Sequence, residues 1–312
     1  MAILAASAMA DDFGPLEIRN FRSVSIPFLR IDPRPDVLGQ GERSLSLGFT
    51  AANDIRKLYV GGVAVVDEDY EIDRLLARYR VGLGHELDAT FDLPILDRSG
   101  GFLDPLVSAW HRFVLRGYPS QRDGVPYGQI RVLLPGNGPY GSAFGIGDLS
   151  ASLSRRLTPR LMGTVAVKLP TGDAHKILGS GAVDSAVALQ YRTALGPRWT
   201  VFVQAGAVAQ GSSTELRNTR PLVHQEAVVL TCRANSRDEW VAQWQGEASS
   251  TETGISGSDA PHRLISFGFH RKLSERQMLE LFFSEDRDFL NIGGLTGVGP
   301  DFTAGVRVVT RF

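Results

Sequence analysis

The last residues of the chain, Phe302 to Phe312, read F-T-A-G-V-R-V-V-T-R-F. A β-strand turns successive side chains to opposite faces. One face of this stretch therefore carries Phe302, Ala304, Val306, Val308, Thr310 and Phe312, and the other face carries Arg307 and Arg311. A tilted strand of ~9–11 residues is long enough to cross a bilayer. The pattern predicts a strand whose apolar face points either to a soluble core or to lipid.

The same stretch resembles the C-terminal signal by which outer-membrane barrels are recognised for assembly. In that signal, alternate apolar residues lead up to a terminal aromatic residue, and Val306, Val308 and Phe312 match this pattern. Thr310 departs from it, because the signal usually carries a larger apolar residue there. The resemblance implies an apolar face toward lipid, with Arg307 and Arg311 in a polar lumen.

The same alternation recurs along the chain from Ser44 onward. In its clearest example, Leu87, Ala89, Phe91, Leu93 and Ile95 alternate with Glu86, Asp88, Thr90 and Asp92. With a turn placed at residues 52–54, the pattern predicts thirteen strands between Ser44 and Phe312. Because bacterial barrels usually have an even strand number, the prediction is twelve to fourteen strands. We favour fourteen, with the proline-interrupted stretch 24–29 as the additional strand.

Short and long connections alternate along the chain. Short turns are expected near residues 84, 157, 196, 235 and 274, and long ones at 96–140, 171–182, 211–221, 248–261 and 287–300. Periplasmic turns and extracellular loops of an outer-membrane barrel differ in this way. The fold class predicted is therefore an all-β, antiparallel, up-and-down transmembrane barrel. The alternative is a soluble β-sandwich, whose strands are usually shorter and whose loops need not alternate.

Residues 1–10 end in Ala8-Met9-Ala10, which has the form of a signal-peptidase site after a short apolar run. No basic region precedes the run, so we interpret residues 1–10 as the remnant of a longer signal peptide. Residues 11–312 are then expected to form one barrel domain. Within it, residues 11–42 act either as a plug or as the first strand.

Composition excludes several classes of protein. The formal net charge is −1, with 43% hydrophobic and 21% charged residues, which gives no electrostatic reason to expect nucleic-acid binding. No apolar stretch reaches the ~18 residues of a membrane-spanning helix. The chain has one cysteine, Cys232, and six scattered histidines. No nucleotide-binding or metal-binding motif occurs, so we expect no cofactor, no metal site and no enzymatic activity.

Residues 104–114 interrupt the strand pattern. Asp104 and Pro105 suit a helix start, and Leu106, Val107, Trp110, Phe113 and Val114 recur at helical spacing. We predict a short amphipathic helix in a long extracellular loop. Asp104, Trp110 and His111 are candidates for a plug helix in the barrel mouth, and the alternatives are a helix at the membrane interface or one that only shields the barrel end.

Charged residues on the polar strand faces are the candidates for lining the lumen. They carry both signs, so they could form pairs across a narrow pore or fill the interior. They are Arg74, Arg78, Arg80, Glu86, Asp88, Asp92, Lys168, Arg192, Glu239, Glu247, Glu280 and Arg307.

Three motifs resemble an uncharacterised family of proteobacterial outer-membrane proteins. They are Gly14-Pro15-Leu16 with Arg19-Asn20, Gly100-Gly101-Phe102-Leu103-Asp104 with His111, and Lys168-Leu169-Pro170-Thr171-Gly172-Asp173. The chain is also distantly similar to barrels encoded with phenol-degradation pathways. The resemblance runs from about residue 14 to residue 312 and implies location and fold more than activity.

These observations predict a passive channel or transporter for small molecules, hydrophobic ones among them, in the outer membrane of a Gram-negative bacterium. Its expected partners are outer-membrane lipid, the barrel-assembly machinery and an unidentified solute. One alternative is a structural or surface-interaction barrel with a closed lumen, whose sign would be a continuous salt-bridge network across the bore. A lipid-modifying enzyme is a third hypothesis, but no Ser/His/acid cluster supports it.

Overall fold

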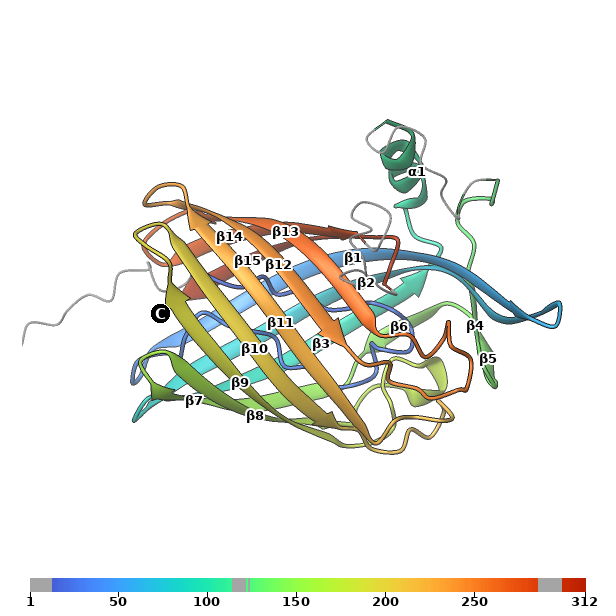
Figure 1. Cartoon of the computed structure of the whole chain (residues 1–312), viewed down its shortest axis with the longest axis horizontal. Helices are drawn as coiled ribbons and strands as arrows, with labels where there is room; N and C mark the ends of the chain where they lie inside the picture. Colours follow the sequence, from blue (N-terminus) through green and yellow to red (C-terminus); the bar gives the residue numbers. More distant parts are fainter. Residues whose placement is uncertain (1–12, 114–121, 123, 286–298) are drawn as a thin grey trace, which may run out of the picture.

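The computed structural model describes residues 13–113, 122, 124–285 and 299–312. The expected signal-peptide remnant and most of the loop expected at 287–300 lie outside these described residues, as does Val114. The rest of the chain folds into one antiparallel sheet that closes on itself (Figure 1).

Twelve strands of the described chain form the closed wall. Hydrogen bonding between β1 and β15 and between β2 and β3 completes the circle. In chain order the wall strands are β1 (Arg43–Val60), β2 (Val63–Gly84), β3 (Leu87–Ser99), β7 (Leu149–Thr158), β8 (Leu161–Leu169), β9 (Asp184–Ala194), β10 (Trp199–Ala209), β11 (Leu222–Arg233), β12 (Asp238–Glu247), β13 (His262–Lys272), β14 (Gln277–Glu285) and β15 (Phe302–Arg311). The predicted all-β antiparallel barrel is confirmed.

The preferred number of fourteen strands is wrong for two reasons. Residues 52–54 do not turn but continue β1, and the hairpin turn lies at Gly61 and Gly62, whose φ angles are positive. The sequence pattern predicts a separate strand between residues 58 and 66. In the structure this stretch instead contains the end of β1 and the beginning of β2. Residues 24–29 do not form a strand.

The β1–β2 hairpin extends beyond the wall, because β15 pairs with β1 only as far as Asn53. Two short strands, β4 (Arg131–Leu134) and β5 (Asn137–Tyr140), continue the sheet along this extension, where β4 pairs with β2. A third, β6 (Ala143–Ile146), pairs with residues 95–98 near the C-terminal end of β3. A short 3₁₀ turn, η2 (Ala174–Lys176), lies in the β8–β9 connection.

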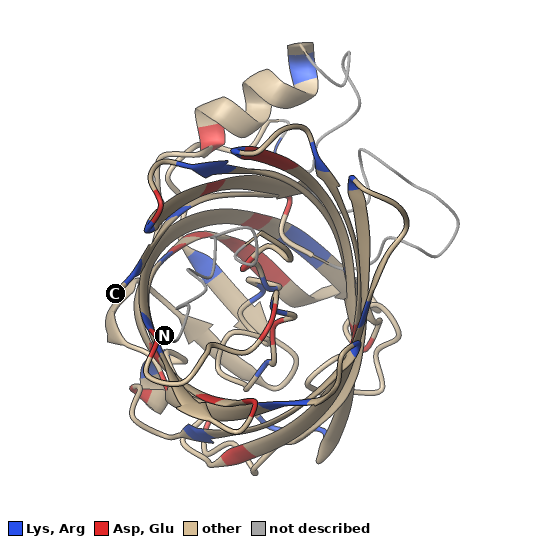
Figure 2. Cartoon of the chain, turned by 90° about the vertical axis from the view of Figure 1, so that its left-hand side faces the viewer, with Lys and Arg blue, Asp and Glu red and all other residues tan. Residues whose placement is uncertain are grey.

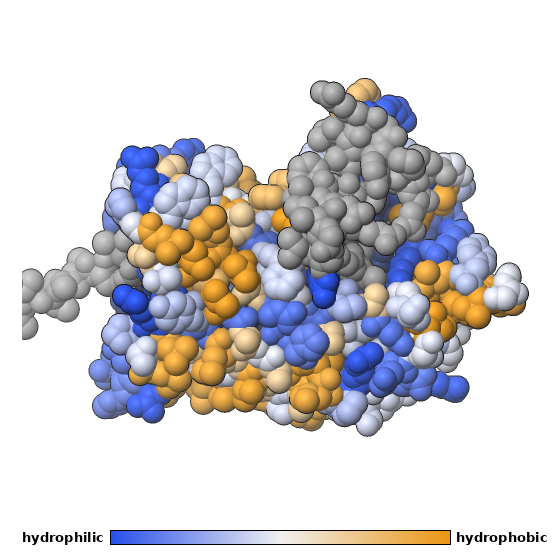
Figure 3. Space-filling model, in the orientation of Figure 1, coloured by the Kyte–Doolittle hydropathy of each residue, from blue (hydrophilic) through white to orange (hydrophobic). Residues whose placement is uncertain are grey.

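The two faces of the wall have opposite character. On β1, Leu45, Leu47 and Phe49 are exposed on the outside, whereas Ser44 and Ser46 are buried on the inside. Exposed apolar side chains cover much of the flank of the barrel between its ends (Figure 3). A soluble sheet would bury its apolar face. The reversed pattern is that of a barrel surrounded by lipid, and it argues against the soluble β-sandwich.

The segment from Phe13 to Gln40 runs through the interior of the barrel as irregular chain (Figure 2). A short turn at residues 23–27 is its main local structure, with Ser25 N and Ile26 N donating to Arg22 O. Leu16, Ile18 and Phe21 are completely buried. Residues 13–42 therefore do not form the expected first strand, and a plug role for this segment stays a prediction.

Helix α1 (Asp104–Phe113) lies outside the wall, near the ends of β1 and β15 (Figures 1 and 2). Val107 packs with Ala51 and Phe302 on the outward face of the sheet. Trp110 contacts Phe302 and Phe283, with ring centroids 6.1 and 5.9 Å apart. The predicted helix is present, but the hypothesis that Asp104, Trp110 and His111 belong to a plug is wrong. No helix among the described residues is long and apolar enough to span a membrane.

Candidate functional site

Residues 13–38, here called the plug segment, are held to the inner wall through their own backbone. Gln190 on β9 accepts from Arg34 N at 2.8 Å and donates to Arg34 O at 2.6 Å. Gln243 on β12 binds Leu16 in the same two-sided way, at 2.9 and 3.2 Å. Each amide replaces the partner that a neighbouring strand would otherwise supply.

Gln225 on β11 accepts from Ile31 N at 3.1 Å and donates to Leu29 O at 3.2 Å. Gln204 on β10 donates to Ile31 O at 2.8 Å. Glutamine suits this role because its side-chain amide is both a donor and an acceptor. Buried backbone groups need such partners, since an unpaired one costs free energy comparable to a lost hydrogen bond. The glutamines therefore explain how an irregular chain can lie buried inside a sheet.

Wall carboxylates accept from further backbone N–H groups of the plug segment. Asp184 Oδ2 accepts from Leu29 N at 2.9 Å, and Asp88 Oδ2 accepts from Leu38 N at 3.1 Å. Prolines at 27, 33 and 35 reduce the number of N–H groups that need a partner. The same prolines prevent this segment from joining the wall as a central strand.

Ion pairs join the plug segment to the wall at several heights. Glu17 Oε1 lies 2.5 Å from Arg74 Nη2, Arg30 Nη1 lies 2.7 Å from Glu247 Oε2, and Asp32 Oδ2 lies 3.1 Å from Arg78 Nη2. Near the β1–β2 extension, Arg22 pairs with Glu68 and with Asp54. These groups are almost entirely buried, so removing one partner would leave an uncompensated charge.

Apolar side chains of the plug segment also pack against the inner face of the wall. Leu16 and Ile18 form a buried cluster with Phe202, Val229 and Phe282, which face inward from the wall. Gly268 makes room for this packing, because a Cβ at that position would lie 2.4 Å from a methyl carbon of Leu16. The wall thus carries a hollow matched to one side chain of the plug segment.

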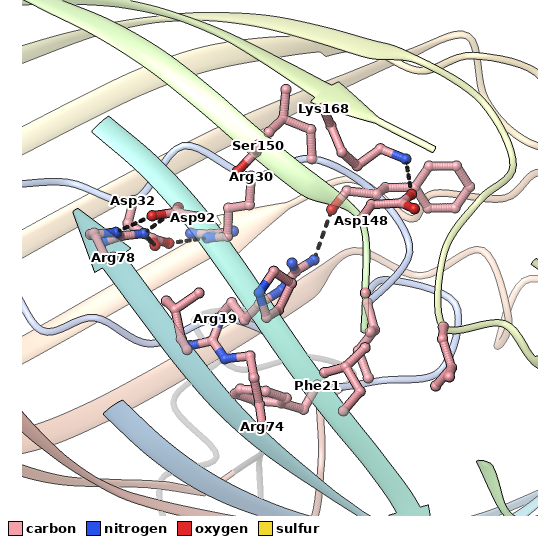
Figure 4. A pocket seen from close by; sticks show the side chains of 18 residues that line it. Arg19, Phe21, Arg30, Asp32, Arg74, Arg78, Asp92, Asp148, Ser150 and Lys168 are labelled. Atoms are coloured by element: carbon pink, nitrogen blue, oxygen red, sulfur yellow. Dashed lines mark hydrogen bonds and ion pairs between the residues drawn. The ribbon is translucent and has the colours of Figure 1, made fainter. Parts of the chain in front are cut away.

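A cavity of about 60 Å³ remains between the plug segment and the wall (Figure 4). This volume holds only a few water molecules. Its charged lining consists of Arg19, Arg30, Asp32, Arg74, Arg78, Asp92, Asp148 and Lys168, and its apolar lining includes Phe21, Phe28, Leu76 and Leu96. Arg19 Nη2 donates to the carbonyl oxygens of Ser25 and Phe28, at 2.6 and 3.0 Å. This cavity has no room for a solute larger than a few water molecules.

The wall also carries ion pairs of its own. Glu280 accepts from His270 Nε2 at 2.8 Å and from Arg307 Nε and Nη2 at 3.0 and 2.6 Å. Lys168 Nζ lies 2.5 Å from Asp148 and 3.3 Å from Asp184. Charges of both signs therefore cross-link neighbouring strands behind the plug segment.

The structure places the sequence-predicted lumen residues as follows. Arg74, Arg78, Arg80, Asp88, Asp92, Lys168, Arg192, Glu239, Glu247, Glu280 and Arg307 lie on the inner face, buried or partly buried. Glu86 instead lies in the β2–β3 turn with its side chain 55% exposed, where it pairs with Arg156. Val306 and Val308 face outward, and Phe312 follows the end of β15 with its side chain exposed.

Sequence reasoning missed the residues that hold the plug segment. Gln190, Gln204 and Gln243 alternate with apolar neighbours, so their inward orientation could be read from the strand pattern. The pattern does not indicate their partners, because Gln190 and Arg34 are 156 positions apart in the chain. Among the described residues, no group of three or more His, Cys, Asp or Glu side chains could hold a metal ion.

Comparison with solved structures shows a shared fold. The COG4313 outer membrane channel from Pseudomonas putida F1 is 15% identical with a TM-score of 0.60, and the match covers 91% of this chain and 100% of that one. The NanC porin is 6% identical (TM-score 0.48, 86% and 98% covered), and the P. putida toluene transporter TodX is 10% identical (TM-score 0.40, 88% and 89% covered).

No curated protein matches the chain in sequence. A family model does match, over residues 1–304, and its description is "Protein of unknown function (DUF3187)". The predicted resemblance to an uncharacterised barrel family is thereby confirmed. The chain belongs to the DUF3187 family.

Proposed function

We propose that this protein is an outer-membrane channel for small molecules whose lumen is closed at rest by the plug segment. The observation that carries the proposal is how the segment is attached. Side chains of the wall bind its backbone, and no strand ladder joins it to the sheet. Such a segment can leave the lumen without breaking any hydrogen bond between wall strands.

Two further features support a channel. The outward apolar face and inward polar face suit a barrel in lipid with a water-accessible lumen. The fold is similar to that of a protein described as an outer membrane channel. Solutes would be small molecules with an apolar part, because Phe21, Phe28 and Leu96 line the remaining cavity beside its charged groups.

The second candidate is a barrel without transport, whose closed lumen serves only stability. The ion pairs across the lumen favour this reading, because buried pairs such as Glu17–Arg74 and Asp32–Arg78 resist separation. The two candidates differ in one property. A channel needs the plug segment to move, and a structural barrel does not.

An engineered disulfide that fixes the plug segment to the wall distinguishes the channel from the structural barrel. Ser25 Oγ on the plug segment lies 2.7 Å from His262 Nδ1 on β13, so these two side chains are direct neighbours and the pair is a candidate for a disulfide. In a Cys232→Ser background, the Ser25→Cys/His262→Cys protein would be reconstituted into liposomes and solute influx measured. We expect uptake under reducing conditions and loss of uptake after oxidation, with the Cys232→Ser protein insensitive to redox state. Absence of uptake in both states, with the heat-modifiable gel mobility of a folded barrel retained, would favour the structural barrel.

A further inference from the structure

Arg19 of the plug segment carries a positive charge that no carboxylate of the described chain neutralises through an ion pair. Its Nη2 donates to the backbone carbonyls of Ser25 and Phe28, at 2.6 and 3.0 Å. Its Nε is inaccessible to solvent and has no hydrogen-bond partner within the described chain. Carbonyl oxygens satisfy N–H groups but carry no net charge, and a desolvated ion without a counter-ion is costly. Arg19 therefore lies where an anion would be stabilised.

Four other basic residues line the same cavity as Arg19, and each of them has a carboxylate partner. The pairs, with their N–O distances, are Arg30–Glu247 (2.7 Å), Arg74–Glu17 (2.5 Å), Arg78–Asp92 (2.7 Å) and Lys168–Asp148 (2.5 Å). Two carboxylates act on Arg19 from a longer distance, those of Glu247 and Asp32. Both already pair with other arginines. Among the cavity-lining cations, Arg19 is thus the one whose charge is left over.

Two further N–H groups beside the cavity lack partners. Arg30 Nη2 and Arg74 Nε are buried and form no hydrogen bond within the described chain, and their side chains are only 4% and 8% exposed. Buried donors of this kind are almost always paired in native proteins. Arg19, Arg30 and Arg74 lie around the same cavity (Figure 4). A water molecule there would satisfy donors only, whereas an anion would also neutralise Arg19.

The size and lining of the cavity select the class of anion. Its volume of about 60 Å³ holds a few water molecules. A halide ion is about as large as one water molecule and fits, whereas an organic acid does not. Phe21, Phe28 and Leu96 form the apolar part of the lining and offer no hydrogen bonds from their side chains. This environment favours a small, weakly hydrated monovalent anion over sulfate or phosphate.

We propose that the cavity between the plug segment and the wall is a binding site for a chloride-sized monovalent anion. The anion neutralises Arg19, and Arg30 and Arg74 supply further donors from the plug segment and from β2. Because the site includes residues of both the plug segment and the wall, a bound anion strengthens the docking of the segment. The inference rests on the position of the plug segment and does not require that the lumen ever opens.

Bromide tests the site directly, because it replaces chloride and scatters X-rays anomalously. Crystals of the full chain would be soaked in sodium bromide. We expect an anomalous peak within hydrogen-bond distance of the Arg19 guanidinium. The peak should be absent from crystals of Arg19→Gln, which keeps an N–H donor but removes the charge.

Thermal unfolding tests the site in solution, since a ligand that binds only the folded state raises the midpoint. The midpoint would be measured by circular dichroism in sodium chloride and in sodium gluconate of equal ionic strength. We expect a higher midpoint in chloride for the wild type and no chloride-specific gain for Arg19→Gln. The matched control is Arg98→Gln. Arg98 also donates to two backbone carbonyls, those of Gly141 and Lys176, but it does not line the cavity, so this variant should keep the gain.

Absence of a bromide peak at Arg19 in the wild type would overturn the proposal, because the cavity would then hold water only. An equal chloride gain in the wild type and Arg19→Gln would also overturn it, as would a peak without any gain, which means binding at crystal concentration only. If Arg19→Gln does not fold, the wild-type peak and the saturation of the wild-type gain with chloride decide. A protein that binds bromide at Arg19 and never conducts would refute the channel proposal and leave this inference intact.

Discussion

Gln190 and Arg34 share two hydrogen bonds, in which one side-chain amide satisfies both backbone groups of a residue inside the barrel. Gln190 also lies directly opposite Gln204, which binds the same plug segment. The inner wall therefore binds this segment through paired amides, much as a sheet would bind an added strand.

Removing two of these amides should loosen the plug segment. Gln190→Leu with Gln225→Leu deletes four hydrogen bonds to its backbone. At ~0.5–1.5 kcal/mol each, docking of the segment should weaken by about 2–6 kcal/mol. Hydrogen exchange of residues 29–34 should speed up, while the wall strands keep their protection.

Gln245→Leu is the matched control for that change. Gln245 is buried on β12 two residues beyond Gln243, but its amide has no hydrogen-bond partner within the described structure. Exchange of residues 29–34 should therefore stay at the wild-type rate. Equal acceleration by Gln245→Leu would mean that wall polarity in general, and not the backbone contacts, holds the segment.

Trp110→Ala should release helix α1 from the wall without affecting the lumen. Trp110 packs against Phe283 and Phe302 on the outer face, so its loss removes aromatic contacts outside the barrel only. Faster hydrogen exchange at 104–113 with unchanged single-channel conductance is the expected result. Leu106→Ala, at an exposed position of the same helix, serves as the control. A changed conductance in Trp110→Ala alone would contradict the external position of the helix.

Glu280→Ala should destabilise the barrel strongly. Glu280 is completely buried and compensates Arg307 and, when protonated, His270. Breaking a buried pair by removing one partner costs about 3–5 kcal/mol, so the midpoint of heat-induced mobility change on a gel should fall. Glu275→Ala, in the exposed β13–β14 turn, should leave the midpoint unchanged. Similar midpoints for all three proteins would show that the buried network adds little stability.

Much of the wall could be predicted because alternation is a local signal. The stretches Leu87–Ile95 and Phe302–Phe312 carry it clearly, and both form strands of the barrel. The prediction failed at residues 52–54, where Asn and Asp resemble a turn. There the side chain of Asn53 binds Asp104 and Arg122 instead, so its polarity serves a tertiary contact within β1.

The plug segment could not be predicted with the same certainty. Its prolines excluded a central strand, but they fit an edge strand equally well. The contacts that decide its position join residues far apart in the chain, such as Leu16 with Gln243, which are 227 positions apart. The helix illustrates the same limit, since its apolar stripe shows that Val107 and Trp110 are covered but not by which face of the wall.

Single-channel conductance of the barrel with and without residues 13–38 tests the central claim most directly. The shortened chain keeps β1 through β15, and heat-modifiable mobility would show that it folds. If the plug segment closes the lumen, the full chain conducts little or only in brief openings, and the shortened chain conducts steadily at a higher level. Equal, low conductance of two folded proteins would contradict the account, because the wall side chains alone would then close the bore.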